Sequence, residues 1–228
     1  MNSFSIYDKL SANADKYYAF YKKLVEDNEK FNLTSITAFE EVAYKHFIDS
    51  IYKKDVFETN KSVVEIGSGA GFPSVPLAIE RADLKFTLIE SNNKKCNFLN
   101  EVKDMLGLQN VTVICDRAEN VGKDGRYRET FDYVIARAVA PMRTLLEYAM
   151  PLIKVGGSCV FWKGETGTEE LKQSANALKV LSAGENANEI YNYDLGEYGE
   201  RTIIVVTKKS VTPAKYPRGL GKERKCPL

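Results

Sequence analysis

Residues 63–79 read VVEIGSGAGFPSVPLAI, an apolar run followed by a glycine-rich turn and a helical stretch. Gly67, Gly69 and Gly71 fall in the turn, where residues without a Cβ let the backbone bend sharply and approach a ligand closely. Pro73 follows at a position where it can begin a helix. A strand, a glycine turn and a helix in this order predict the first unit of an open α/β sheet, with a ligand site at the turn.

Short β-branched runs alternate with helical stretches from residue 61 onward. Parallel strands require crossover connections, and the helical stretches supply them. Two later runs are joined by the turn-prone GEYGE and predict an antiparallel pair at the edge of the sheet. The fold class is therefore α/β, a doubly wound, mostly parallel, seven-stranded sheet of the Rossmann-like kind. The expected strands are residues 61–66, 85–90, 110–115, 131–136, 158–162, 188–195 and 201–208.

Two further segments flank the sheet domain, which we place at residues 61–207. Residues 1–60 carry apolar side chains at helical spacing, and Thr37 with Glu40 has the form of a capping box that starts a second helix. We expect this segment to form a helical cap packed on the sheet domain. Residues 208–228 contain several prolines and are expected to have no regular structure.

Glu90 ends the second expected strand and lies 23 residues after Gly67. A carboxylate about 20 residues beyond the glycine turn is where adenosine cofactors find an acceptor for their ribose hydroxyls. The glycine pattern is GxGxG, because Phe72 stands where the dinucleotide motif GxGxxG has its third glycine. Glu65 adds a carboxylate near the turn, which suits the cationic S-adenosylmethionine better than a pyrophosphate. These features favour S-adenosylmethionine as the cofactor, with a dinucleotide site or a purely structural turn as the alternatives.

Charged residues follow the third and fourth expected strands. Asp116, Arg117, Ala118 and Glu119 come where a doubly wound fold can contact an adenine ring, although a solvated loop is an equal alternative. Arg137 ends the fourth strand, where it can contact the methyl donor, a phosphate or O6 of a guanine, or form a surface ion pair. That strand is followed by neither an Asn-Pro-Pro-aromatic run nor a Pro-Cys pair, so a covalent nucleophile is not indicated.

Two basic residues beside other apolar strands can line a groove together with Arg117 and Arg137. Lys163 follows one expected strand and Arg201 opens the last one. His46 is the only histidine of the chain, and we expect it to pack or cap a helix and to take no part in catalysis. A single histidine and scattered cysteines predict no metal site.

The four cysteines are far apart in the sequence and form no CxxC pair. This spacing indicates neither a zinc site nor a redox dithiol, and a reduced cytoplasm is the expected setting. The first residues lack the basic flank and apolar stretch of a signal peptide, and no run of roughly 20 apolar residues is present to span a bilayer. We therefore expect a cytoplasmic monomer without a membrane partner. The cysteines are Cys96, Cys115, Cys159 and Cys226.

The overall charge is nearly balanced, with 32 Lys plus Arg against 31 Asp plus Glu. This balance argues against a protein that coats nucleic acid. The carboxyl-terminal tail differs, because its basic residues are accompanied by one acid, Glu223, and such a tail can seek a polyanion. The basic residues of the tail are Lys208, Lys209, Lys215, Arg218, Lys222, Arg224 and Lys225.

An ordered series of motifs resembles one known family. Together the motifs resemble the bacterial 16S ribosomal RNA guanine-N7 methyltransferase family, also called the glucose-inhibited division protein B family. The resemblance runs from about Phe31 to the carboxyl terminus, with Ser74 standing where the family usually has glycine. The motifs are FNLTS (31–35), KHFIDS (45–50), the glycine turn (63–79), DRAE (116–119), FDYVIARAVAP (131–141), FWKG (161–164) and YPRGLGKERKCPL (216–228).

The resemblance implies a class I S-adenosylmethionine-dependent methyltransferase that modifies guanine N7 in 16S ribosomal RNA of the small subunit. N7 carries a free lone pair, so no general base is expected, and Arg137, Arg117 and Lys163 would act by positioning. Implied cofactor contacts are Gly67, Phe72, Glu90, Ala118, Glu119 and Arg137, to which the turn adds Glu65, Gly69 and Gly71. Implied RNA contacts are Arg117, Arg137, Lys163 and Arg201, to which the tail adds Arg218, Lys222, Arg224 and Lys225.

Deleting the residues after Lys209 is therefore expected to weaken RNA binding and to leave donor binding nearly intact. Three other functions remain open from the sequence. The first is methyl transfer to a small molecule or a protein, which would make the basic tail incidental. The second is a nicotinamide-dependent dehydrogenase, and the third is a non-catalytic RNA-binding domain that kept the fold.

Overall fold

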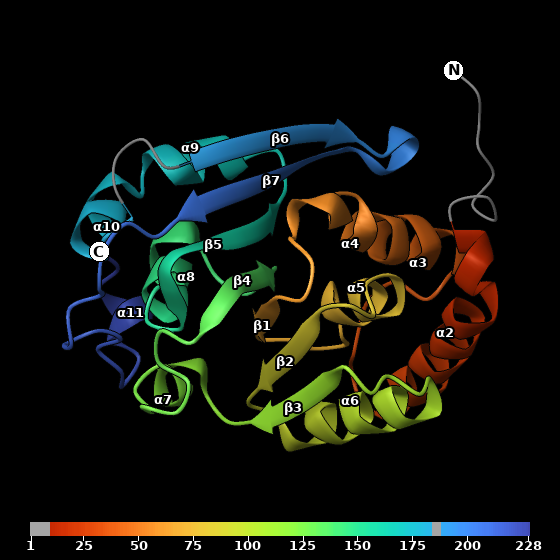
Figure 1. Ribbon diagram of the computed structural model, residues 1–228. Coiled ribbons are helices and arrows are strands. Elements are labelled where there is room, and N and C mark those ends of the chain that lie inside the picture. The colour runs from red at the N-terminus through yellow and green to blue at the C-terminus, as the bar shows by residue number, and fades with distance from the viewer. Residues whose placement is uncertain (1–9, 184–187) are drawn as a thin grey trace.

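A seven-stranded sheet lies at the centre of the computed structural model, which describes residues 10–183 and 188–228 (Figure 1). The strand order is β3-β2-β1-β4-β5-β7-β6, so the order reverses beside β1. Ligands of open α/β sheets bind at such a reversal, beyond the carboxyl ends of the strands. The strands are β1 Ser62–Ile66, β2 Lys85–Glu90, β3 Val111–Cys115, β4 Phe131–Arg137, β5 Ile153–Lys163, β6 Asn188–Asp194 and β7 Glu200–Thr207.

The direction of the strands confirms the predicted fold class. Strands β1 to β5 pair in parallel, whereas β7 is antiparallel to both β5 and β6. The edge pair of β6 and β7 is the one that the sequence predicted.

Helices cover both faces of the sheet (Figure 1). Helices α2, α4, α5 and α6 supply buried side chains to one core, and α7, α8, α9 and α10 supply them to the other. The bounds are α2 Ala14–Asn28, α3 Phe39–Val42, α4 Asp49–Ile51, α5 Ser74–Glu80, α6 Asn93–Met105, α7 Ala118–Val121, α8 Met142–Ala149, α9 Gly167–Lys172, α10 Ala175–Val180 and α11 Lys222–Lys225. Short 3-10 turns lie at Ser11–Asn13, Lys54–Val56 and Gly196–Tyr198.

The two cores follow from the period-two geometry of the strands. Val63 of β1 and Ile135 of β4 belong to the core that includes α2, whereas Val64 and Val134 belong to the core that includes α8. Neighbouring residues of a strand point to opposite faces, so a sheet covered on both sides has continuously apolar strands.

The amino-terminal helices share a core with the sheet. Phe20 of α2 packs 5.1 Å from Phe72 of the glycine turn and 5.7 Å from Phe47, measured between ring centroids. Helix α2 also lies alongside α6 (Figure 1). The segment that precedes the sheet domain is thus continuous with its hydrophobic interior.

The second amino-terminal helix differs from its prediction at the start and in the middle. It begins at Phe39 after Ala38, and no side chain caps it, so the capping role expected for Thr37 is wrong. Residues Ala43–Ile48 form a π-helical segment between α3 and α4, and His46 lies within it. Such π-helical turns are often found at functional sites, because they redirect side chains within a helix.

The carboxyl-terminal tail is docked on the sheet domain. Lys208 is fully buried, and its Nζ donates to the carbonyl oxygens of Met150 at 2.7 Å and Ile153 at 2.9 Å. Arg128 donates to the carbonyl oxygens of Tyr216 and Thr212 farther along the tail. The tail also contains the one-turn helix α11, so the expectation that it has no regular structure is wrong there.

The cysteine expectation also needs correction, because Cys96 and Cys115 form a disulfide with a Cα–Cα distance of 5.8 Å. Cys96 lies in α6 and Cys115 ends β3, and their 19-residue separation gave no sign of this pairing. The contact arises because α6 packs beside β3. Within the described residues, no helix has the length and apolar character needed to cross a membrane.

Candidate functional site

The glycine turn is held by the end of β2. The backbone N–H groups of Gly67 and Ser68 donate to the carbonyl oxygen of Ile89, and the N–H of Gly69 donates to Glu90 Oε2 at 2.9 Å. Glu90 Oε1 accepts from the backbone of Asn92 at 2.9 Å. The turn and the Glu90 carboxylate therefore meet, as the sequence predicted, and each oxygen keeps a lone pair for a ligand hydroxyl.

Two of the glycines are required by the space around them. Gly67 has φ +66°, and a Cβ there would lie 3.0 Å from the side chain of Val139. Gly71 has φ +90°, and a Cβ there would lie 2.6 Å from Val75. A side chain at either position would strain the backbone, and it would crowd Val139 at Gly67 and collide with Val75 at Gly71.

A cavity of about 150 Å³ opens beyond the carboxyl ends of β1, β2 and β3. It contains Gly67 together with the residues that follow β3, so the predicted adenine contacts lie beside the turn. Tyr148 of α8 and Arg224 of α11 also line it, and the sequence did not predict either as an adenine neighbour. We call this space the donor cavity; its lining is Ile66, Gly67, Ile89, Ser91, Asp116, Arg117, Ala118, Glu119, Val139, Tyr148 and Arg224.

Two residues predicted to contact the cofactor are buried away from this cavity. The ring of Phe72 stacks on His46 with a centroid distance of 4.5 Å and packs against aromatic rings of the helical cap. Glu65 is 1% exposed, and its oxygens have no hydrogen-bond partner within the described residues. Burial raises the pKa of Glu65 to about 8, although the nearby hydroxyls of Ser74 and Ser68 oppose the rise. Neither Phe72 nor Glu65 lines the donor cavity.

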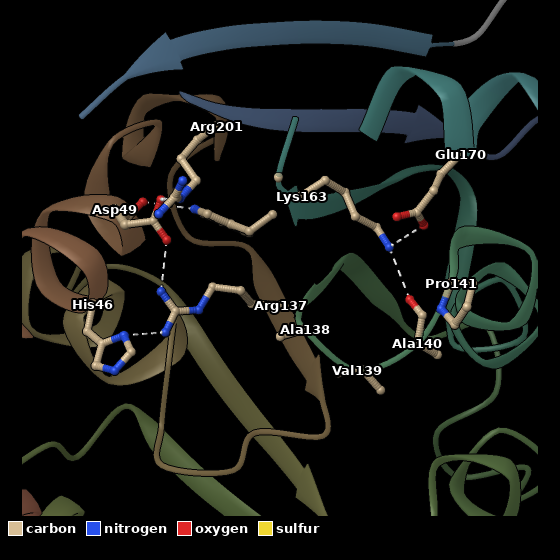
Figure 2. A pocket seen from close by; sticks show the side chains of 12 residues that line it. His46, Asp49, Arg137, Ala138, Val139, Ala140, Pro141, Lys163, Glu170 and Arg201 are labelled. Carbon is tan, nitrogen blue, oxygen red and sulfur yellow. Dashed lines mark hydrogen bonds and ion pairs between the residues drawn. The ribbon is translucent and has the colours of Figure 1, made fainter. Parts of the chain in front are cut away.

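A second cavity, of about 540 Å³, lies at the carboxyl ends of β4 and β5 (Figure 2). Three basic side chains reach it from three different strands, as Figure 2 shows. We call this space the acceptor cavity. Its lining is His46, Asp49, Arg137, Ala138, Val139, Ala140, Pro141, Trp162, Lys163, Gly164, Glu170 and Arg201.

Arg137 is fixed by the amino-terminal helices. Its Nη1 donates to Asp49 Oδ2 at 2.8 Å and to the carbonyl oxygen of Lys45 at 2.9 Å. Its Nη2 contacts His46 Nδ1 at 2.8 Å, and the guanidinium carbon lies 5.3 Å from the centre of the Phe72 ring. These contacts use three of the five guanidinium N–H donors, which leaves two for a ligand. The surface ion pair considered for Arg137 is thereby replaced by a largely buried one.

The protonation of His46 follows from this arrangement. His46 Nδ1 lies 2.8 Å from Arg137 Nη2, which can only donate, and 3.1 Å from the carbonyl oxygen of Lys45, which can only accept, while Nε2 lies 3.0 Å from Thr34 Oγ1. Burial, together with the charge of Arg137, lowers the pKa of His46 to about 3. The imidazole is therefore neutral at physiological pH and orients Arg137.

The other two basic residues are also held by acceptors. Lys163 Nζ donates to Glu170 Oε2 at 2.9 Å and to the carbonyl oxygen of Ala140 at 3.0 Å. Arg201 Nε lies 3.9 Å from Asp49 Oδ1, which also accepts the hydroxyl of Tyr193 at 2.7 Å. Asp49 is only 3% exposed, so one buried carboxylate holds both arginines.

The two cavities adjoin. Val139 lines both of them and packs against the backbone of Gly67. A ligand at the glycine turn and a ligand beside Arg137 would thus be neighbours. This geometry suits transfer of a small group between two bound molecules.

The predicted basic groove is only partly assembled. Arg137, Lys163 and Arg201 share the acceptor cavity, whereas Arg117 lies in the donor cavity with its side chain 71% exposed and its Nη1 3.6 Å from Glu119. In the tail, Arg218 is occupied by the buried Glu147, to which its Nε donates at 2.8 Å. Lys222 and Lys225 are exposed.

The sequence interpretation did not identify four residues that line the acceptor cavity or hold its basic side chains in place. His46 and Asp49 belong to the motif KHFIDS, so a histidine and an aspartate three residues apart could have signalled a shared role. Glu170 and Tyr193 have no comparable signal, because they reach Lys163 and Asp49 only through tertiary packing. Within the described part of the chain, no group of His, Cys, Asp and Glu side chains could hold a metal ion.

Comparison with known proteins identifies the family. The family model described as rRNA small subunit methyltransferase G matches residues 13–192. The chain belongs to this family. It is 48% identical over 216 residues to ribosomal RNA small subunit methyltransferase G of Exiguobacterium sibiricum, covering 93% of this chain and 90% of the relative. The protein of that name from Staphylococcus aureus strain Newman is 46% identical, covering 93% of this chain and 89% of the relative.

Solved structures share the fold of this methyltransferase G family member. A precorrin-6y C5,15-methyltransferase from Geobacter metallireducens superposes with a TM-score of 0.53 at 15% identity, covering 80% of this chain and 96% of that one. TYW2 from P. horikoshii, solved with MeSAdo, gives a TM-score of 0.55 at 15% identity, covering 72% and 63%. The sheet therefore has the fold of these methyltransferases. Membership of the methyltransferase G family makes the chain a methyltransferase and disfavours the dehydrogenase alternative.

Proposed function

We propose that this chain transfers a methyl group from S-adenosylmethionine to N7 of a guanine in 16S ribosomal RNA of the small subunit. The observation that carries the proposal is the shared wall at Val139, which joins a cavity at the glycine turn to a cavity lined by three basic side chains. Family membership supplies the reaction class and the kind of acceptor. We propose further that the enzyme acts in the cytoplasm as a monomer.

The residues of the donor cavity fit S-adenosylmethionine. Gly67 lines the cavity and gives a ligand access to bare backbone. Glu90 is 8% exposed and holds the glycine turn without lining the cavity, and its remaining carboxylate lone pairs would accept ribose hydroxyls at the end of β2. Ala118 and Glu119 line the place where the adenine would bind. When bound, S-adenosylmethionine supplies an electrophilic methyl group on a positively charged sulfur.

The acceptor cavity suits a purine that needs no deprotonation. Guanine N7 carries its lone pair in the plane of the ring, and N7 with O6 is the pair of acceptors that arginine and lysine recognise best. The cavity presents Arg137, Lys163 and Arg201 as donors, while His46 is neutral and engaged with Arg137. These side chains can orient the base and neutralise phosphates, and the main catalytic effect is alignment of two bound reactants.

The deciding experiment is methyl transfer from labelled S-adenosylmethionine to small subunits that lack the modification, followed by mapping of the methylated nucleotide. We expect label at N7 of a guanine in 16S ribosomal RNA. Incorporation only into protein or a small molecule would refute the proposed acceptor, and absence of transfer by the folded enzyme would refute the catalytic role.

Arg137→Lys tests the central basic residue. Arg137→Ala would remove the nearer of the two arginines paired with the buried Asp49, at a cost of up to about 3–5 kcal/mol in stability, so the lysine variant is the cleaner probe. Loss of the planar donor fork should lower kcat/KM for transfer about 10- to 100-fold. Arg143→Lys makes the same change on the exposed side of α8 and should retain activity. If both variants were equally active, the proposed role of Arg137 in methyl transfer would be wrong.

A further inference from the structure

The carboxyl-terminal tail returns to the donor cavity along a path fixed by buried contacts. Glu147 of α8 is fully buried and accepts from the backbone N–H of Arg218 at 2.9 Å and from its side chain. Thr144 Oγ1 donates to the carbonyl oxygen of Glu223 at 2.9 Å, and the Glu223 carboxylate accepts the N–H of Gly219. These bonds hold α11 against α8.

Docking of the tail brings Arg224 into the wall of the donor cavity. Arg224 lines the cavity with Ala118 and Glu119, although the sequence separates it from them by more than 100 residues. It lies next to Tyr148, a second wall residue contributed by α8. Burial raises the pKa of the Tyr148 hydroxyl, and hydrogen bonding to Arg224 opposes the rise, which agrees with their proximity.

The chemistry of this wall suits one part of the proposed donor. An adenine presents ring-nitrogen acceptors and a flat π-face, and a guanidinium can donate to the first or stack on the second. The neighbouring wall residues Asp116 and Glu119 are acidic and cannot donate to ring nitrogens when ionised. The described cations of the cavity are Arg117, directed to Glu119, and Arg224.

We propose that Arg224 is a donor-binding residue that contacts the adenine of S-adenosylmethionine, so that the docked tail forms one side of the donor site. This inference rests on the proposed function. It changes the role expected for the tail, because Arg224 was assigned to RNA and deletion after Lys209 was expected to spare donor binding. With the tail removed, the donor cavity loses a wall.

The test is calorimetric binding of S-adenosylhomocysteine, and of 5′-methylthioadenosine, which keeps the adenosine and lacks the amino acid. Arg224→Gln should weaken both ligands by the same factor, about 5- to 20-fold. Arg224→Lys should recover little of the loss, because lysine has the charge without the planar fork. Lys225→Gln is the matched control, because this substitution also removes one positive charge from α11. Lys225 is exposed and does not line the cavity.

Each result has a defined meaning. Weaker binding by Arg224→Gln together with wild-type binding by Lys225→Gln supports the contact between Arg224 and the adenine. Both substitutions are at exposed residues, so both variants should keep the wild-type melting temperature. If Arg224→Gln binds both ligands as tightly as the wild type, the inference about Arg224 is wrong and the proposed function stands. The same conclusion follows if both variants weaken binding equally. Failure of the wild-type protein to bind S-adenosylhomocysteine would instead overturn the proposed function.

Discussion

The buried carboxylate of Asp49 orders the basic side chains of the acceptor cavity. It accepts from Arg137 at 2.8 Å and lies 3.9 Å from Arg201 (Figure 2). It also accepts the hydroxyl of Tyr193 at 2.7 Å. Its own backbone carbonyl accepts the indole N–H of Trp162 at 2.9 Å. A cation that is locked in this way keeps its remaining donors in one direction, which is the preorganisation that positioning catalysis requires.

Glu65 provides a pH-dependent prediction at the residue scale. Its ordinary pKa of 4.5 is raised to about 8 by burial, so the folded protein holds a proton that the unfolded chain releases. The resulting stability is fully present below pH 4.5 and is lost as the pH rises through 8. Relative to Glu65→Gln, the wild-type protein should therefore lose up to about 1.4 kcal/mol per pH unit between pH 5 and 8.

Denaturant unfolding of both proteins at several pH values in that range measures the difference. Subtracting the two curves cancels groups that titrate in both proteins. Glu58→Gln, an exposed substitution, should run parallel to the wild type. Parallel curves for Glu65→Gln and the wild type would show that Glu65 has an ordinary pKa.

At the scale of elements, β7 and the tail are joined by a lysine in the core. Lys208 follows β7 and donates to Met150 and Ile153 carbonyl oxygens and to Glu129. Burial lowers its pKa, and the ion pair with Glu129 opposes that shift. Lys208 had been counted among the tail residues that could seek a polyanion, but a fully buried ammonium cannot reach one.

Lys208→Met should consequently destabilise the fold by about 2–4 kcal/mol, because it removes the ammonium donor from the carbonyl oxygens of Met150 and Ile153 and breaks the ion pair with Glu129. Chemical unfolding measures this loss. Lys209→Met alters an exposed neighbour and should change stability by less than about 0.5 kcal/mol. A fully stable Lys208→Met variant would show that the buried contacts contribute nothing.

At the scale of the whole molecule, the helical cap and the sheet domain share one core. Trp162 is the only tryptophan, and its indole N–H bonds the backbone of Asp49, so it reports on the junction between cap and sheet. We predict that Trp162 fluorescence and far-UV circular dichroism follow a single, coincident unfolding transition. Two separated transitions would indicate that residues 1–60 unfold independently.

Local patterns in the sequence were sufficient for the fold class and for the turn at Gly67. Strand and helix periods, glycine placement and the offset of Glu90 act over short stretches, so they can be read without knowing the rest of the fold. The contact of Gly69 with Glu90 and the antiparallel β6–β7 edge agree with those predictions.

Only the tertiary structure decided which charged side chains are available and which neighbours they have. Packing buries Lys208 and Glu65 and pairs Arg218 with the buried Glu147. Packing also places Arg117 and Arg224 in the lining of the donor cavity. It brings Asp49 within hydrogen-bond distance of Arg137. These outcomes depend on contacts between segments far apart in the chain. The energy of a charge is set by its burial and its partners, and neither is encoded by residue type or local spacing.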